Sequence, residues 1–481
     1  MLRQRSSRIS LTRIAQLCCV GAFTWVVPGC AVRDTWGKAR KEGDLTAHEQ
    51  SVPEKWSRGP KIPSKAATGW LADFGNGELT RLVDEAIAKN PDLKATAARV
   101  TQARAQVRIA GADLWPQAAT DFNARRNQSA SGQRFVGVGQ RSNRFELGLD
   151  VSWEVDFWGR IKDQRGAAVA DAEAAAEDLH AAKLSLAANV VKGAVTLVES
   201  KEQVRLAEDN VNSRRTHLQI VERQLERGLD SDRAALDVSL SRADLARAEE
   251  SLALRKRASD EARRVLEVLL GAYPGGKETG LSALPTVKLK VPAGIPSEVL
   301  LRRPDIRAAE RRLEASLREE SAAKKAFLPS FNLTGGTGLS TEDLSFLIDQ
   351  GSVVWTVAGN VAQQIFQGGR IKANVDLARA RYEEALALYA STATTAFKEV
   401  ESALSAEAYL LEQEAALERA STEAARSVQL ATGQYERGLV DILTLLDAQQ
   451  RAFDARSALA VIKAQRLRNR ADLHLALGGD F

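Results

Sequence analysis

Residues 190–229 read VVKGAVTLVESKEQVRLAEDNVNSRRTHLQIVERQLERGL. Apolar side chains recur here at seven-residue spacing, at Val190, Leu197, Val204, Val211, Leu218 and Leu225. This spacing is typical of one apolar seam of a coiled-coil helix. The wider region 158–227 contains no proline and only three glycines. At 1.5 Å per residue, these 70 residues predict a helix about 105 Å long, longer than an ordinary globular domain requires.

The second half of the chain repeats this long helix. Region 369–437 has the same seven-residue spacing at Tyr382, Tyr389, Ala396, Ala403, Leu410, Leu417, Ala424 and Ala431. Both long helices end at the tripeptide Arg-Gly-Leu, at 227–229 and at 437–439. The two tripeptides are 210 residues apart, which indicates an internal duplication.

Two proline motifs recur with a similar offset. A Pro-Asp pair opens an alanine- and arginine-rich run at 91–92 and again at 304–305, 213 residues later. Proline suits the first turn of a helix, and aspartate favours the positive end of its dipole. A second proline follows 25 residues after each pair, at Pro116 and Pro329. Each repeat therefore begins with a helix of about two dozen residues, by the spacing of its prolines.

The segment before each long helix alternates with period two. In the first repeat, Phe145, Leu147, Leu149, Val151 and Trp153 alternate with Glu146, Gly148, Asp150 and Ser152. This alternation predicts strands with one apolar face, at 119–129 and 144–155 and at 331–334 and 353–361. Each repeat is predicted to be a helix, a β-hairpin, a long helix, a tight turn and a return helix. The return helices are predicted at 232–270 and 441–477.

Four strands per chain are too few to close a barrel. Open sheet edges cannot face lipid, because their backbone groups would have no hydrogen-bond partners. If the hairpins enter a membrane, several chains must therefore pool their strands. Three chains would supply twelve strands, an even number within the range of known barrels. The pattern requires an oligomer but does not by itself fix its size.

The N-terminus has the pattern of an export signal. Four arginines lie within residues 1–13, followed by an apolar run at 14–27 that is short for a membrane span. The run ends in Val-Pro-Gly-Cys at 27–30, which resembles a bacterial lipobox. We therefore predict a lipoprotein signal peptide at 1–29 and acylation of Cys30. The alternative is an ordinary signal peptide with an incidental cysteine. Residues 30–75 contain Pro53, Pro60 and Pro63 and are predicted to form an extended linker.

Composition excludes several functional classes. Without the four N-terminal arginines, 63 basic residues face 62 acidic ones, so the charge gives no support to a nucleic-acid partner. The histidines (His48, His180, His217 and His474) are scattered and have no cysteine pair near them, so no zinc site is expected. No nucleophile–base set, phosphate-binding loop or metal cluster is recognisable. We expect no enzyme activity, no catalytic residue and no cofactor.

The order and duplication of these motifs resemble the TolC-type outer-membrane efflux proteins. VSWEVDFWGR at 151–160 and LLDAQ at 445–449 resemble the family's motifs, and the lipobox resembles its lipoprotein branch, which serves RND-type pumps. The resemblance covers roughly residues 70–478. It implies an α+β membrane protein in which four strands per chain contribute to a homotrimeric, twelve-stranded outer-membrane barrel. A long α-helical coiled-coil barrel would continue it into the periplasm.

The resemblance also implies a domain order and a set of partners. The expected order is a first efflux repeat at 76–273, an inter-repeat linker with a short helix at 274–303, and a second repeat at 304–478. The protein would sit, lipid-anchored, in the outer membrane and passively conduct drugs or other small toxic solutes. An inner-membrane RND-type transporter and a periplasmic adaptor, the membrane-fusion protein, would deliver them. The sequence does not identify the transported substrate.

The two Arg-Gly-Leu turns are the first candidate site. By the resemblance, they form hairpin tips that the adaptor grips, and the residues concerned are Arg227, Gly228, Leu229, Arg437, Gly438 and Leu439. The alternative is a plain helix C-cap, because glycine adopts the left-handed conformation at low cost.

The second candidate site is a periplasmic gate just past the second turn. Asp447 matches a family position whose carboxylates line the constriction, where a three-fold ring would favour cations. The position three residues earlier, often acidic in the family, is Thr444, which suggests a gate with less charge. Asp441 is a further candidate. The alternative for Asp447 is a structural carboxylate bonded to a neighbouring helix.

Two other channel or periplasmic functions stay open at this point. One is the outer channel of a type I protein-secretion system, against which the lipobox argues weakly. The other is a periplasmic coiled-coil lipoprotein adaptor. Adaptors have one helical hairpin between β-rich halves, however, whereas this chain has a duplicated long helix with strands before it.

Overall fold

The computed structural model describes residues 56–57, 69–128, 141–227, 231–287, 299 and 301–479. These residues lie in one compact unit, 53–481. The predicted signal peptide, Cys30 and most of the predicted linker lie outside the described residues, as do Gly228 and Leu229.

The two predicted long helices are present. They are α5 (Arg160–Glu226) and α9 (Arg370–Tyr435), and each is followed by a return helix, α6 (Ser231–Leu269) or α10 (Ile442–Ala476). All eight seam positions predicted in α9 are buried or half-buried. In α5 the predicted seam is buried at Val190, Leu197 and Val211, but its last two positions, Leu218 and Leu225, are only half-buried. A second row with the same spacing, Ala207, Arg214 and Val221, is buried there as well.

Each repeat opens with the shorter helix that its proline motif predicts. These helices are α4 (Pro91–Ala112) and α8 (Pro304–Lys325). The Asn90 side-chain oxygen accepts a hydrogen bond of 3.0 Å from the Leu93 amide, which caps α4. Two elements before α4 were not predicted: η2 (Trp70–Phe74), inside the predicted linker, and α3 (Gly77–Lys89). Their aromatic and aliphatic side chains belong to the core, so tertiary burial rather than local periodicity fixes them.

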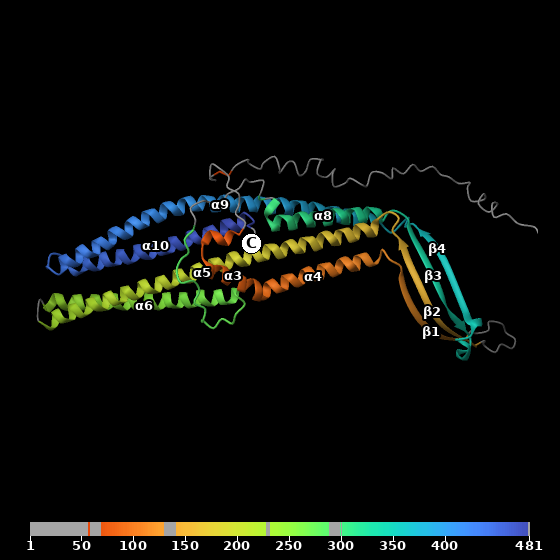
Figure 1. Ribbon diagram of the computed structural model, residues 1–481, viewed down its shortest axis with the longest axis horizontal. Helices are drawn as coiled ribbons and strands as arrows, with labels where there is room; N and C mark the ends of the chain where they lie inside the picture. Colours follow the sequence, from red (N-terminus) through yellow and green to blue (C-terminus); the bar gives the residue numbers. More distant parts are fainter. Residues whose placement is uncertain are drawn as a thin grey trace, which may run out of the picture. The chain divides into compact units, whose positions relative to one another are not determined.

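The four strands form one antiparallel sheet in the order β1-β2-β3-β4 (Figure 1). They are β1 (Gln117–Gln128), β2 (Arg141–Val155), β3 (Ser330–Thr341) and β4 (Val353–Ala362). Between β3 and β4 lie two short 3-10 turns, η3 (Leu344–Phe346) and η4 (Gln350–Ser352). Strand β3 continues past its predicted end through several glycines. At Gly338 a Cβ atom would clash with the Leu147 carbonyl oxygen, so glycine permits close strand approach there.

The register of the sheet gathers its apolar side chains on one face. Leu147 lies opposite Phe122 on β1 and Leu339 on β3, and Leu339 lies opposite Val353 on β4. This apolar face comprises Phe122, Phe145, Leu147, Leu149, Val151, Trp153, Phe331, Leu333, Leu339, Val353, Trp355, Val357 and Val361. None of the described helices lies over the sheet (Figure 1), and Trp355 and Val357 are each 78% exposed.

The helices pack side by side in two series. Around the long return helices the packing runs α6, α5, α10, α9; on the strand side of the unit it runs α4, α5, α8, α9. Each series begins with an element of the first repeat and ends with one of the second. The main core lies where α3, α5, α6 and α10 meet, and includes Trp70, Val190, Leu266 and Leu467.

Candidate functional site

The α9–α10 turn contains one predicted tip. Gly438 has φ +73°, the left-handed conformation that glycine adopts without strain. Its amide donates to the Tyr435 carbonyl at 2.9 Å, and the Leu439 amide donates to the Gln434 carbonyl at 2.9 Å. These bonds satisfy the last carbonyls of α9. The turn therefore has the geometry of a helix cap, which leaves open whether it also binds a partner.

The same turn is exposed and firmly supported. Leu439 is 68% exposed, and a Cβ atom at Gly438 would have no described residue within 4 Å beyond its two chain neighbours. The Arg437 Nε atom donates to the Gly433 carbonyl at 2.8 Å. Beneath the turn, α9 and α10 are joined by an apolar cluster of Ala431, Ile442, Leu445 and Leu446. The turn thus presents a fixed shape with free space above Gly438.

Of the first tip, only Arg227 is described. It is exposed and follows the last residue of α5, with its amide donating to the Arg223 carbonyl at 3.3 Å. Gly228 and Leu229 lie outside the described residues.

Asp441 and Thr444 are partners at the start of α10. The Asp441 Oδ1 atom accepts hydrogen bonds from the Thr444 amide at 2.9 Å and from its hydroxyl at 2.6 Å. This is the N-cap arrangement that satisfies an otherwise unpaired amide in the first turn. Two of the three residues of the predicted gate are thus engaged in local structure at the start of α10.

Asp447 lies one to two turns farther along α10. Its Oδ2 atom lies 2.8 Å from the Arg451 Nε atom, and the side chains are 60% and 75% exposed. An exposed pair at i,i+4 stabilises the helix by at most about 1 kcal/mol. Asp447 also borders a cavity of about 440 Å³ between α5, α6 and α10, together with Arg214 and Asp244.

Two buried polar residues of α5 underlie α10 and were missed by sequence reasoning. Arg214 is 5% exposed and His217 is 4% exposed. Sequence reasoning treated His217 as one of several scattered histidines. A usable signal was present, because Arg214 stands seven residues after Ala207 and seven before Val221, both buried. A charged residue at a coiled-coil core position marks a special contact.

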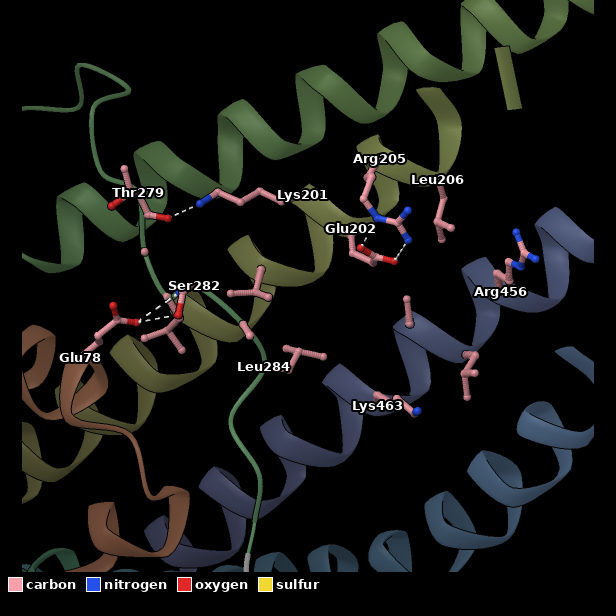
Figure 2. Close-up of a pocket in the computed structure, with 16 residues that line it drawn as sticks. Glu78, Lys201, Glu202, Arg205, Leu206, Thr279, Ser282, Leu284, Arg456 and Lys463 are labelled. Carbon is pink, nitrogen blue, oxygen red and sulfur yellow. Dashed lines mark hydrogen bonds and ion pairs between the residues drawn. The ribbon is translucent and has the colours of Figure 1, made fainter. Parts of the chain in front are cut away.

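Another cavity bordered by α5 and α10 lies away from the turns. It has a volume of about 760 Å³ and is bordered by α5, α10 and residues 279–284 (Figure 2). Lys201 donates to the Thr279 carbonyl, and Glu78 accepts from the Ser282 amide at 3.2 Å. Figure 2 shows that these contacts fasten the segment after α6 onto α3 and α5. The cavity therefore belongs to the junction between the repeats.

A metal site is not evident in the described part of the chain. No group of three or more histidine, cysteine, aspartate or glutamate side chains there is placed to hold an ion.

The family model described as "Outer membrane efflux protein" matches residues 82–272 and 295–479, most of the chain in two segments. The chain therefore belongs to the outer membrane efflux protein family.

Individual relatives agree with this assignment. The chain is 33% identical to the cation efflux system protein CusC of Escherichia coli O6:H1, over 86% of this chain and 88% of CusC. It is also 33% identical to the outer membrane protein OprJ of Pseudomonas aeruginosa, over 96% of this chain and 93% of OprJ. The structure of the Campylobacter jejuni CmeC outer membrane channel superimposes with a TM-score of 0.83 at 28% identity, over 88% of this chain and 90% of CmeC. The predicted family, the outer-membrane location and the channel fold with four strands and long helices are confirmed.

Proposed function

We propose that this outer-membrane efflux protein works as a homotrimer, the passive outer channel of a tripartite system. One observation carries the proposal: the four-stranded sheet has two unpaired edges and an uncovered apolar face. In the described chain, β1 pairs only with β2, and β4 pairs only with β3. An open edge in lipid would leave backbone groups without partners.

Repetition of the chain around an axis would close the sheet and both series of helices into rings. The free elements of one chain, β4 and α9, belong to the second repeat, and those at the other end, β1, α4 and α6, belong to the first. Joining β4 of one copy to β1 of the next continues the sheet, and the helices follow the same order. Exposed apolar residues on both outer helices, including Leu254 on α6 and Leu388 on α9, support such a seam. Three copies give a barrel of twelve strands, about the size of known even-numbered barrels.

The two faces of the sheet fit the two environments of such a barrel. Its apolar face would contact lipid. The opposite face carries Asp121, Glu146, Asp150 and Asn332 and would line the water-filled interior. Acylation of Cys30 would add a lipid anchor, since each buried CH₂ contributes about 0.8 kcal/mol.

We assign the docking of a periplasmic adaptor to the two turns. Arg437, Gly438 and Leu439 present a supported, exposed surface at the α9–α10 turn. By the sequence repeat, Arg227, Gly228 and Leu229 are their counterparts in the first half of the chain. A helical hairpin of an adaptor would fit between such turns. The energy for transport would come from an inner-membrane RND-type transporter, which also selects the solute.

We assign the gate to the start of α10, with Asp447 as its charged residue. Three copies of Asp447 around one axis would form a carboxylate ring, and Arg451 in each copy would reduce its charge. Asp441 and Thr444 would shape the gate as the cap of α10 rather than as free charges. The efflux names of the relatives favour an efflux system over the protein-secretion alternative.

The test is the molar mass of the detergent-extracted protein, corrected for bound detergent, followed by bilayer conductance. Three chains per particle and single-channel steps are expected. A stable monomer would contradict the proposal, because four strands would then keep two open edges in the membrane.

A further inference from the structure

Two buried side chains of α5 lie directly beneath the helix that carries Asp447. Farther from the turn, several polar pairs join α5 to α10, among them Arg468 with Glu199 at 2.7 Å and Lys192 with Asp472 at 2.9 Å. Closer to the turn, Arg214 of α5 donates to the Leu446 carbonyl of α10, and His217 borders a cavity that Leu445 and Gln449 of α10 also line.

Arg214 holds the backbone of α10. Its Nη2 atom donates to the Leu446 carbonyl at 3.4 Å and to the Gln450 Oε1 atom at 3.3 Å. Leu446 is the residue before Asp447, so this contact fixes the position of the candidate gate residue. The two bonds are long, and the Nη1 atom of Arg214 is buried without a partner. The interaction of Arg214 with α10 is therefore weaker than that of an arginine with all its donors paired.

His217 packs against the other helix of the gate hairpin. Its ring centre lies 5.9 Å from that of Tyr435 on α9, at an interplanar angle of 62°. The Nε2 atom of His217 and the Oε1 atom of Gln449 on α10 are both buried without a partner. Both residues border a cavity of about 640 Å³ between α5 and the α9–α10 hairpin. Opening of the hairpin away from α5 would bring water to both atoms.

The charges around His217 come from every neighbouring helix. On α5 the guanidinium of Arg214 opposes a second positive charge, and the Asp209 carboxylate borders the same cavity. On α6, Asp237 and Asp244 favour a positive charge on His217. From α9 and α10 the cavity receives Glu436, Tyr435 and the neutral Gln449. Burial first, and then Arg214, lower the pKa of His217 below its ordinary value despite the two aspartates.

We propose that Arg214 and His217 are positioning residues of the gate, and that they hold the α9–α10 hairpin closed on α5 only while His217 is neutral. The inference rests on the proposed function, because it takes the start of α10 as the gate. Protonation would place a second cation beside Arg214 in a buried site. The hairpin would then move away from α5, because an exposed His217 is hydrated and bears its charge at lower cost.

The direction of the pH effect follows from proton linkage. His217 has a lowered pKa in the closed state and an ordinary one, about 6.5, when exposed. The closed state is therefore fully favoured above about pH 6.5 and loses this advantage as the pH falls toward the lowered value. Linkage to one proton limits this shift toward opening to about tenfold per pH unit and per chain. If the three chains open together, the equilibrium constant for opening would change by up to about a thousandfold per pH unit.

The experiment measures single-channel open probability of the reconstituted full-length protein from pH 7.5 to 5.5, a window above the titration of ordinary carboxylates. Wild type is expected to open more at low pH. His217→Gln is neutral at both pH 7.5 and pH 5.5, so its open probability is expected not to change with pH. His217→Lys is expected to be open already at pH 7.5. His180→Gln, on an exposed part of α5, and His474→Gln, at the far end of α10, are matched controls that retain the wild-type profile.

A second measurement tests the contact between α5 and the α9–α10 hairpin independently of conductance. Spin labels at Gln219 on α5 and Leu443 on α10, both exposed, report the α5–α10 distance in trimers with one labelled chain. The distance is expected to increase at pH 5.5 in wild type and to stay constant in His217→Gln. A conducting channel whose pH profile and distance are the same in wild type and His217→Gln overturns the inference and leaves the proposed function intact. A pH-dependent distance with no conductance under any condition overturns the proposed function instead.

Discussion

Glu267 near the end of α6 stabilises the junction between the repeats through backbone contacts. Its carboxylate accepts hydrogen bonds from the amides of Gly276, Lys277 and Glu278 at 2.8, 2.6 and 2.9 Å. These bonds, led by the one from Glu278, lower the pKa of Glu267 below its ordinary value. A single side chain thereby organises the loop that follows α6.

At this residue we predict a pH-dependent loss of thermal stability in Glu267→Gln. The stabilisation from a lowered carboxylate pKa is fully present above about pH 4.3 and is lost as the pH falls through the lowered value. The variant should therefore unfold at a lower temperature than wild type at pH 7, and the difference should shrink below pH 4. Glu261→Gln, on an exposed position of the same helix, serves as the control. An equal difference at both pH values would show that the charge of Glu267 is irrelevant.

Asp447 and Arg451 give a second prediction at residue scale, on ion selectivity. Removing the carboxylate in Asp447→Asn leaves Arg451 without its partner, so the channel should shift toward anions. Arg451→Gln should shift it toward cations. Reversal potentials in a salt gradient measure both. Identical potentials in wild type and both variants would remove Asp447 from the gate.

At the scale of elements, the α9–α10 turn allows a capping role to be distinguished from a docking role. Gly438 has a positive φ, so any side chain costs about 1–2 kcal/mol, less for asparagine. The space around it is open, because a Cβ atom at this position would meet no described residue beyond its two chain neighbours within 4 Å. A large residue should therefore obstruct a partner without disturbing the helices.

We accordingly predict that Gly438→Trp abolishes efflux in cells while the trimer still assembles, and that Gly438→Asn retains most of it. Drug or metal susceptibility of a deletion strain expressing each variant, with trimer recovery from membranes, measures the effect. Normal efflux by Gly438→Trp would assign the turn to capping alone.

At the scale of the whole molecule, the apolar sheet face has meaning only in an assembly. Val357 and Thr356 are neighbours on β4 that point to opposite faces, and Val357 pairs with Gly335 while Thr356 pairs with Gly336. We predict that Val357→Lys reduces the recovery of membrane-inserted trimer, because a lysine facing lipid costs about 2–4 kcal/mol near the bilayer centre. Thr356→Lys, on the polar face, should insert normally. Equal recovery of both variants would contradict the assignment of the faces.

The sequence by itself determined the duplicated plan of this chain. Seven-residue spacing over dozens of residues and strict alternation in β2 are local patterns, and local patterns predict long helices and strands well. The Pro-Asp and Arg-Gly-Leu motifs located helix ends because proline and glycine restrict the backbone directly. The glycine-rich continuation of β3 escaped notice, since its glycines are explained only by the closeness of β2.

Only the tertiary structure determined what lies beneath the candidate gate. The positions of Arg214 and His217 in the sequence do not state which helix covers them. Those facts depend on how α5 and α10, more than two hundred residues apart at this contact, lie against each other. Burial, and with it the lowered pKa of His217, is a property of that packing. Local sequence sets the elements, whereas long-range packing sets the charges that surround each side chain.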